Sequence, residues 1–343
     1  MKMHIRKTLV GLVSFLAVAI LLTSCGGGKK ESSYDKGSTV MYCDEGFASF
    51  MEEEIGVFEY QYPKSHVLCR YMSETDAINA LLADSCQLIV TSKPLTQGQL
   101  NYLKNKRKHI AKSMPIAIDA VAIIVNNDNS LERLNTYDIK DILTGKVTRW
   151  SQLQRKTEGA LDTTMIKVVF DREGSATVNY MQDRFLNGGK FPANAYAQKS
   201  SMDVFKLVEN DPSAIGIISV AWLGEDLEKR SSEAVVVDDA KVKGLENQDE
   251  IVENEFSDRV KILAIGGDNA GYIEDYYLPY QANIYEKGKY PLVRTIYMTS
   301  IALQNSVGQS FYSFVTGFIG QKILTRTGVL PYNVPMRVVE LEE

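Results

Sequence analysis

The chain has 343 residues, 45% of them hydrophobic, and a formal net charge of −5 from 38 basic and 43 acidic residues. This length suffices for a signal segment and about two globular domains. The net negative charge argues against nucleic acid and anionic lipid as partners, but it leaves a small anion open because local donors set that affinity.

The first 24 residues have the layout of a secretory signal peptide. Basic residues precede an apolar run over residues 9–22, and the sequence "LTSC" closes the segment. The small residues before Cys25 fit the cleavage site of a bacterial lipoprotein, so we expect residues 1–24 to be removed and Cys25 to carry a lipid. The alternative is a signal anchor, but it would have about 14 apolar residues where a membrane span needs about 20.

A short polar tether is expected after the lipid. Residues 25–37 are small, polar and charged, which is typical of flexible linkers. No acidic run follows Cys25 directly, which favours a lipoprotein of the cell envelope that faces the periplasm over one displayed at the cell surface. No later stretch reaches membrane-spanning length without polar interruption.

Short apolar runs alternate with amphipathic stretches from residue 38 onward. Phe47, Phe50 and Phe58 recur on one face at helical spacing. The strand-like runs are continuously apolar, which is typical of a parallel sheet covered on both faces, where ligands bind at the carboxyl ends of the strands. The elements predicted here are strands over 38–43, 66–72 and 87–92 and helices over 46–60 and 75–84.

A second α/β segment begins at "DAVAIIVNND" and predicts a second lobe. It includes an acidic stretch over 224–256 without clean periodicity and a tyrosine-rich loop over 270–291. The chain closes with a long amphipathic helix that ends at Gly328, as a C-cap glycine allows. The predicted elements are strands over 119–128, 166–170, 214–222, 260–267 and 292–300 and helices over 136–145, 177–185 and 306–328.

Cysteine and histidine are scarce, and their spacing argues against a metal site. No CxxC pair occurs, and we expect neither a metal nor a cofactor. Three cysteines would remain after lipidation, each in or beside an apolar strand, where an unpaired thiol packs as a small hydrophobe. In an exported chain two of them could instead form a disulfide. These cysteines are Cys43, Cys69 and Cys86, and the histidines are His4, His66 and His109.

Four predicted strand ends carry residues that suit an anion site. The first turn of a helix leaves about four backbone N–H groups free and carries partial positive charge. Hydroxyls there can donate to an oxyanion, and an arginine can bind it through two parallel N–H groups. Each residue alone also has a simpler interpretation, as an N-cap or a surface charge. The residues are Gly46 and Phe47, Ser73 and Glu74, Thr91, Ser92 and Lys93, and Arg172, Ser175 and Thr177.

Several segments, in their order and spacing, resemble the periplasmic phosphate-binding proteins, the substrate-binding subunits of phosphate ABC transporters. They are "DAVAIIVNNDN", "YDIKDILTGKVTRW", "DREGSAT", "AIGIISVAW", "GKYPLVRTIYM" and "SFVTGFIGQKILTRTGVLP". The resemblance implies an α/β type II periplasmic-binding-protein fold, in which each of two lobes is a mostly parallel sheet flanked by helices. Lobe one would comprise residues 38–118 and 296–343 and lobe two residues 119–295, with two chain crossings as the hinge.

The family's second-lobe loop has an arginine followed by a Gly-Ser-Gly-Thr turn that holds the phosphate. By this resemblance Ser175 and Thr177 match the serine and threonine, and Ala176 stands at the second glycine. Arg172 lies one residue closer to the serine than the family arginine, and Asp171 occupies that place. Residue-by-residue matching therefore implies phosphate contacts from Arg172, Ser175, Ala176, Thr177, Gly46, Phe47, Ser73, Ser92 and Lys93.

A phosphate site also needs an acceptor for the proton of the ligand. Phosphate near neutral pH carries a proton and sulfate does not, so a carboxylate in the site favours phosphate and repels sulfate. The candidates are Glu45, Glu74 and Asp171, all at the ends of predicted strands. Each could instead be an acid that stabilises the first turn of a helix.

The sequence thus predicts a monomeric lipoprotein that binds inorganic phosphate and delivers it to the inner-membrane permease subunits of an ABC transporter. Two alternatives keep the fold. One binds sulfate, molybdate or an organic anion, which the shifted Arg172 allows, and the other is an envelope sensor or scaffold, which the tyrosine-rich loop favours. We do not expect an enzyme, because the sequence has no GxSxG or Walker A motif and no histidine near a predicted strand end.

Overall fold

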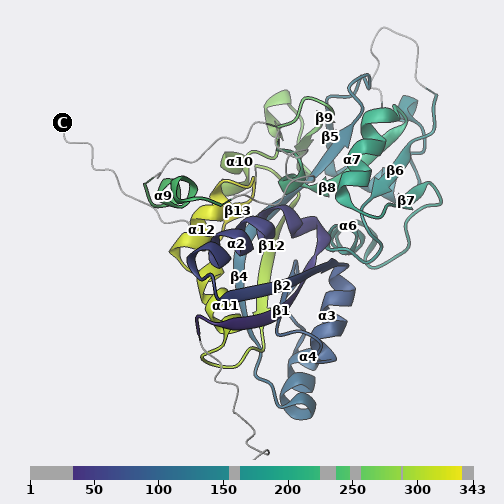
Figure 1. Cartoon of the computed structure of the whole chain (residues 1–343). Helices are drawn as coiled ribbons and strands as arrows, with labels where there is room; N and C mark the ends of the chain where they lie inside the picture. The colour runs from purple at the N-terminus through teal and green to yellow at the C-terminus, as the bar shows by residue number, and fades with distance from the viewer. Residues whose placement is uncertain (1–33, 154–162, 225–236, 248–255, 287–288, 334–343) are drawn as a thin grey trace, which may run out of the picture.

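The chain forms an α/β fold with two lobes that share one long strand (Figure 1). This fold class was predicted and is confirmed. None of the helices in the described part of the chain is long and apolar enough to cross a membrane. Cys25 and the predicted signal and lipid attachment lie outside the described residues. The computed structural model describes residues 34–153, 163–224, 237–247, 256–286 and 289–333.

The first lobe follows the predicted alternation of strands and helices. β1 pairs in parallel with β2 on one side and with β3 on the other, so these strands end at the same edge. Phe47, Phe50 and Phe58 are fully buried, as their helical spacing predicts. The elements are β1 (Gly37–Asp44), η1 (Glu45–Phe47), α2 (Ala48–Gln61), β2 (Ser65–Met72), α3 (Glu74–Leu82), β3 (Leu88–Thr91), α4 (Gln97–Tyr102) and η2 (Leu103–Arg107).

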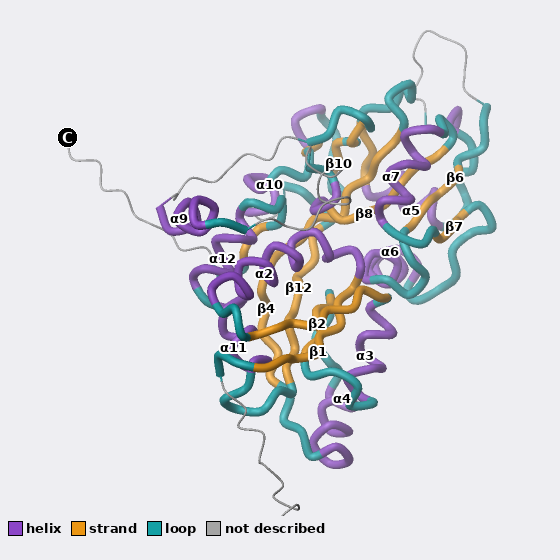
Figure 2. The backbone as a smooth tube through the Cα atoms, in the orientation of Figure 1, coloured by secondary structure: helices purple, strands orange, loops and turns teal. Residues whose placement is uncertain are grey.

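The strand β4 (Lys112–Val125) belongs to both lobes. It pairs antiparallel with β12 (Val293–Ser300) up to Ala120, and from Val121 onward it pairs with β8 (Ala214–Ser219). β4 and β12 lie side by side through the centre of the molecule (Figure 2). The strand order is therefore β2-β1-β3-β12-β4-β8-β6-β7, where β6 is Lys167–Phe170 and β7 is Ala195–Ala197. Two further strands, β9 (Lys261–Ile262) and β13 (Leu330–Pro331), also pair with β4.

The second lobe is built on β6, which is parallel to both β7 and β8. A smaller sheet of β11, β10 and β5 lies in the same part of the chain. Besides β4 and β8, the helices and strands of this second lobe are β5 (Arg133–Asn135), α5 (Thr136–Leu143), η3 (Trp150–Gln152), β6 (Lys167–Phe170), α6 (Ala176–Leu186), β7 (Ala195–Ala197), α7 (Ser201–Asn210), η4 (Val220–Trp222), β9 (Lys261–Ile262), β10 (Ala264–Gly266), η5 (Ile273–Asp275), β11 (Tyr276–Tyr277) and α10 (Gln281–Tyr285).

One helix lies where the sequence shows no periodicity. α9 (Asp239–Asn247) occupies part of the acidic stretch 224–256, for which no element was predicted. Its Leu245 packs against Val57 of α2 and Ile323 near the end of the chain. A single buried leucine is too little to produce a periodic apolar pattern, which explains why the sequence analysis missed the helix.

The C-terminal helix is broken, so the prediction of one helix over 306–328 is wrong. α11 (Val307–Thr316) and α12 (Phe318–Thr325) are separated by Gly317, whose backbone is extended. α12 turns back so closely that a Cβ on Gly320 would lie 2.6 Å from Val315 Cα. Only glycine permits this approach. The chain ends its described part with β13 (Leu330–Pro331), which pairs with β4.

The three cysteines of the described chain are free thiols. Cys43 and Cys86 are buried among apolar side chains, and Cys69 is half-buried. Burial raises the pKa of the Cys43 thiol well above its usual range. The thiols therefore pack as small hydrophobic groups, as the sequence analysis expects.

Candidate functional site

The predicted strand ends meet in a buried polar cluster between the two lobes. β1, β2 and β3 are parallel and end at one edge of the first lobe, beside the first turn of α3. β6 runs in the opposite direction in the second lobe, so its carboxyl end and the first turn of α6 face that edge from the other side. We call these residues the interlobe cluster. Its buried members are Asp44, Glu45, Gly46, Phe47, Ser73, Glu74, Ser92, Asp119, Asp171, Ser175, Ala176, Thr177 and Arg294.

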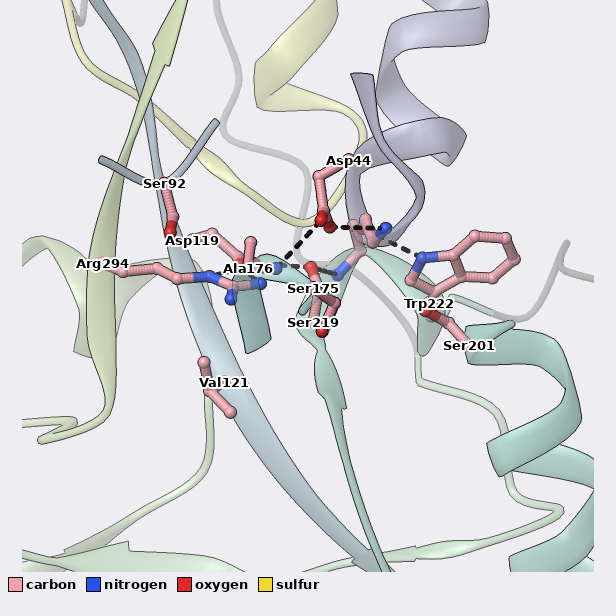
Figure 3. A network of polar contacts seen from close by, with 12 residues as sticks. Asp44, Ser92, Asp119, Val121, Ser175, Ala176, Ser201, Ser219, Trp222 and Arg294 are labelled. Carbon is pink, nitrogen blue, oxygen red and sulfur yellow. Dashed lines mark hydrogen bonds and ion pairs between the residues drawn. The ribbon is translucent and has the colours of Figure 1, made fainter. Parts of the chain in front are cut away.

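Hydrogen bonds across the cluster join the lobes (Figure 3). The backbone N–H of Ala176, the first residue of α6, donates to Asp44 Oδ2 at 2.9 Å. The indole Nε1 of Trp222 donates to the carbonyl of Gly46 at 3.0 Å. Asp44 and Gly46 come from the first lobe and Ala176 and Trp222 from the second, so the structure has the lobes closed on each other.

The loop before α6 is held in place by its own hydroxyl and carboxylate. Ser175 is the N-cap of α6, where its Oγ accepts the N–H of Val178 at 3.1 Å and donates its proton to Asp171 Oδ1. Gly174 has φ = +71°, a conformation that favours glycine. Its carbonyl accepts the backbone N–H and the hydroxyl of Thr75, each at 3.2 Å, so the loop also contacts the first lobe.

Two of the predicted proton acceptors already have donors. Glu74 Oε1 accepts the hydroxyl of Ser92 at 2.7 Å, and Glu74 Oε2 accepts Asn179 Nδ2 at 2.9 Å. Glu45 Oε2 accepts the backbone N–H of Ser201 at 3.0 Å and its hydroxyl at 2.9 Å. These two carboxylates therefore connect the lobes, and their oxygens are engaged in protein contacts.

Arg294 is a member of the cluster that the sequence analysis missed. It projects from β12, its side chain is 2% exposed, and its Nε donates to Asp119 Oδ2 at 2.8 Å. Asp119 Oδ1 also accepts the hydroxyl of Ser219 at 2.7 Å. The guanidinium lies 4.9 Å from the centre of the Phe47 ring, a cation–π distance. A buried arginine is thereby fixed at the inner edge of the cluster.

Several buried polar atoms in the cluster have no hydrogen-bond partner. They include both terminal nitrogens of Arg294, although Nη2 lies 2.8 Å from Asp119 Oδ2 as an ion pair. The hydroxyl of Thr177 and Asp171 Oδ2 have no hydrogen bond of normal geometry, although Thr177 lies close enough to lower the pKa of the Asp171 carboxyl. A Cβ on Gly46 would lie 3.6 Å from Asp171 Oδ2 and 3.9 Å from Thr177 Oγ1, so these two atoms face the same place. Unmet donors and one unmet acceptor thus face this region, and such groups are costly to bury without a partner.

Two basic residues expected in the site make their contacts elsewhere. Lys93 forms an ion pair with Asp183 of α6, and the two side chains are 42% and 58% exposed. Arg172 is half-buried and donates to the carbonyl of Lys199 at 3.1 Å. Both were expected from the sequence as ligand contacts, and their present contacts lie outside the buried cluster.

Burial changes the acidity of the carboxylates. Burial, opposed by the hydrogen bond from Ser175, raises the pKa of Asp171 to about 7. Burial and the charges of Asp171 and Glu74 raise the pKa of Asp44 well above its usual range. Burial also raises the pKa of Glu45, although the Ser201 contacts oppose this. The cluster therefore holds more carboxylate than its single buried arginine can neutralise.

Most of the chain matches a known protein family. Residues 30–317 match the family model of the PBP superfamily domain. The chain belongs to the PBP superfamily. The phosphate-binding protein PstS of Pseudomonas aeruginosa is 22% identical over 290 residues, which cover 81% of this chain and 77% of that protein.

Solved structures share the fold of this PBP-superfamily chain. One is the substrate-binding protein assigned to a phosphate ABC transporter in Clostridium perfringens, solved with bound phosphate. It has a TM-score of 0.62 and 20% identity, and the match covers 87% of this chain and 100% of that one. Another is an ABC-type phosphate transport receptor from Vibrio cholerae, with a TM-score of 0.57 and 19% identity over 86% of this chain and 100% of that one.

The sequence of this PBP-superfamily chain contains a signal that could have identified Asp119 and Arg294 as members of the cluster. Asp119 opens the apolar run "DAVAIIV", and Arg294 lies inside the strand "LVRTIYM". A charge in a strand that is otherwise buried needs a partner, and these two have opposite signs. Pairing them by this argument would have brought Arg294 into the site.

Proposed function

We propose that the chain binds inorganic phosphate between its two lobes and delivers it to an ABC transporter. The names of its relatives support phosphate. One observation in the chain itself carries the proposal: the unpartnered groups of Arg294, Thr177 and Asp171 form a set of donors with one acceptor. A monohydrogen phosphate needs such a set, because its charged oxygens accept and its hydroxyl donates.

Asp171 is the carboxylate we assign to the ligand's proton. The oxygens of Glu45 and Glu74 accept hydrogen bonds from the protein, whereas Asp171 Oδ2 accepts none of normal geometry. Sulfate carries no proton near neutral pH, so its oxygen would face the ionised Asp171 without a hydrogen bond, and the repulsion between them lowers the affinity for sulfate. The site should therefore prefer phosphate.

Arg294 is the cation we assign to the ligand. Asp171 stands in the loop where the family resemblance places an arginine, and Arg294 of β12 supplies a guanidinium from another strand. Two charge-assisted hydrogen bonds contribute about 1.5 to 3 kcal/mol each. With the hydroxyl of Thr177, they approach the roughly 8 kcal/mol of a micromolar complex. We leave Lys93 and Arg172 outside the proposed contacts.

Ligand entry requires the lobes to separate. We propose lobes of residues 38–118 with 296–343 and of residues 119–295, which move on β4 and the residues leading into β12. The bonds from Asp44 to Ala176 and from Glu74 to Asn179 would break on opening and form again on closure. We further propose an extracytoplasmic monomer held to the membrane through Cys25, with ABC permease subunits as its partner and no catalytic activity.

Isothermal titration of the chain starting after Cys25, stripped of ligand, tests the proposal. We expect micromolar or tighter binding of phosphate that excess sulfate leaves unchanged. Tighter binding of sulfate, molybdate or an organic anion would assign the site to that ligand. No heat with any of these anions would favour the sensor or scaffold role and overturn the proposed function.

A further inference from the structure

Asp44 occupies the position of a bound anion at two backbone amides. Its Oδ1 accepts the N–H of Gly46 at 3.0 Å and its Oδ2 accepts that of Ala176 at 2.9 Å. Ala176 begins the 11-residue helix α6, which has no acid of its own in its first turn. A carboxylate from the first lobe therefore compensates the positive end of a helix in the second lobe.

The charges around Asp44 do not balance once a phosphate dianion is added. Asp171, Glu74 and Glu45 contribute carboxylates from the loop before α6, from α3 and from η1. Arg294 of β12 is the buried cation that faces them, and Asp119 of β4 already takes part of its charge. The remaining ionisable groups nearby are Arg172 and Asp203, which act on Glu45, and Cys43, whose thiol donates to the Asp44 carbonyl at 3.2 Å.

We propose that Asp44 is a built-in counter-anion of the free site and that phosphate is bound together with one further proton, held by Asp44. This inference rests on the proposed function. An isolated dianion beside two ionised carboxylates would be strongly disfavoured in a site that excludes water. One added proton removes a negative charge without any change in the polypeptide.

The geometry indicates where the proton lies. Asp171 must be ionised to accept the ligand's own proton, so the added proton belongs on Asp44. Each oxygen of Asp44 accepts one amide N–H and keeps a second lone pair that can carry it. Asp171 Oδ2 lies beside Gly46 and faces the same region as Thr177 Oγ1, where it can accept the proton of the ligand. Burial raises the pKa of both carboxylates, that of Asp171 to about 7 and that of Asp44 well above its usual range, and the two titrate as a pair, so the free protein loses the added proton as the pH rises above neutral. Above that pH, binding must take the proton up again, and affinity falls.

Titration of the wild-type chain with inorganic phosphate in buffers of different ionisation enthalpy measures the proton count. At about pH 8, where phosphate is mostly a dianion, we expect uptake of about one proton per phosphate bound. Affinity should fall by about tenfold per pH unit above neutral, in excess of any effect of phosphate ionisation itself. This measurement uses the wild-type chain, so its result does not depend on whether a variant folds.

Asp44→Asn, with Asp141→Asn as its matched control, identifies the residue. Asparagine keeps the size and one acceptor oxygen but removes the charge, so we expect proton uptake near zero and a flatter pH profile. Asp141 lies on α5 in an ion pair with Lys146, and its variant should keep the wild-type proton count.

The outcomes separate this inference from the proposed function. Failure to bind phosphate at any pH would overturn the proposed function. Phosphate binding without proton uptake in the wild type, or with unchanged uptake in Asp44→Asn, would leave the function standing and overturn the role of Asp44.

Discussion

Two helices begin at the interlobe cluster, and their first turns are compensated in different ways. α3 is capped by Ser73 and carries Glu74 and Asp76 in its first turn. α6 is capped by Ser175, has no acid in its first turn, and receives Asp44 from the other lobe. Since acids near a helix N-terminus neutralise its partial charge, the start of α3 is satisfied locally, whereas the start of α6 depends on an anion from outside.

Because of this difference, the N-terminus of α3 and the N-terminus of α6 are not equally suited to bind an anion. Both are strand-to-helix junctions with a serine cap, and local sequence alone gives them equal standing as anion sites. The charges of Glu74 and Asp76 make the α3 end a poor place for phosphate. The α6 end, with the unpartnered hydroxyl of Thr177 beside it and Arg294 in the same cluster, is the better one.

The strongest test of this comparison replaces the cation of the cluster. Arg294→Lys keeps a positive charge for Asp119 but loses the two parallel N–H groups, so we expect phosphate affinity to fall by about a hundredfold. Titration calorimetry measures the change. The matched control is Arg172→Lys, at the rim, for which we expect less than about a threefold effect. If Arg172→Lys weakened phosphate binding more than Arg294→Lys, Arg172 would be the cation that binds the ligand.

A smaller effect is expected from deleting the amide that Asp44 accepts. Proline is tolerated at the first position of a helix, and the extended backbone of Ser175 is compatible with a following proline. Ala176→Pro should therefore preserve α6 but lose one bond between the lobes, which we expect to weaken phosphate binding by about tenfold. Gln97→Pro, at the exposed first position of α4, is the control. Equal affinities for the two variants would exclude a role for this amide.

The two serine caps give the most direct comparison and the smallest effect. Ser175→Ala and Ser73→Ala should each lower the free energy of unfolding by about 1 kcal/mol, measured by chemical denaturation, because each removes an N-cap. Only Ser175→Ala also removes the donor to Asp171, so it should weaken phosphate binding by several-fold up to about tenfold while Ser73→Ala changes it little. A larger loss in Ser73→Ala would mean that the α3 end holds the ligand.

Local pattern predicts much of the fold and part of the site. The apolar runs place β1, β2, β3 and β6, and the junctions after these strands lie in one cluster, which contains Ser175, Glu74 and Ser92. Contacts between distant segments are harder to predict, because each partner looks ordinary by itself. Arg294 and Asp119 are 175 positions apart in the chain and Asp44 and Ala176 are 132 apart. The break at Gly317 was missed because apolar spacing continues through it, whereas the packing of Gly320 on Val315 requires a corner.

The position of β12 has a consequence for the order of folding during synthesis. β12 lies between β3 and β4 in the sheet but is made after the whole second lobe. At roughly 5 to 20 residues per second, the ribosome needs about ten to thirty seconds to go from the end of β4 to β12. During that time the first lobe lacks a central strand and cannot complete its sheet. An exported chain gains from this delay, because a translocation channel must receive it before it becomes compact.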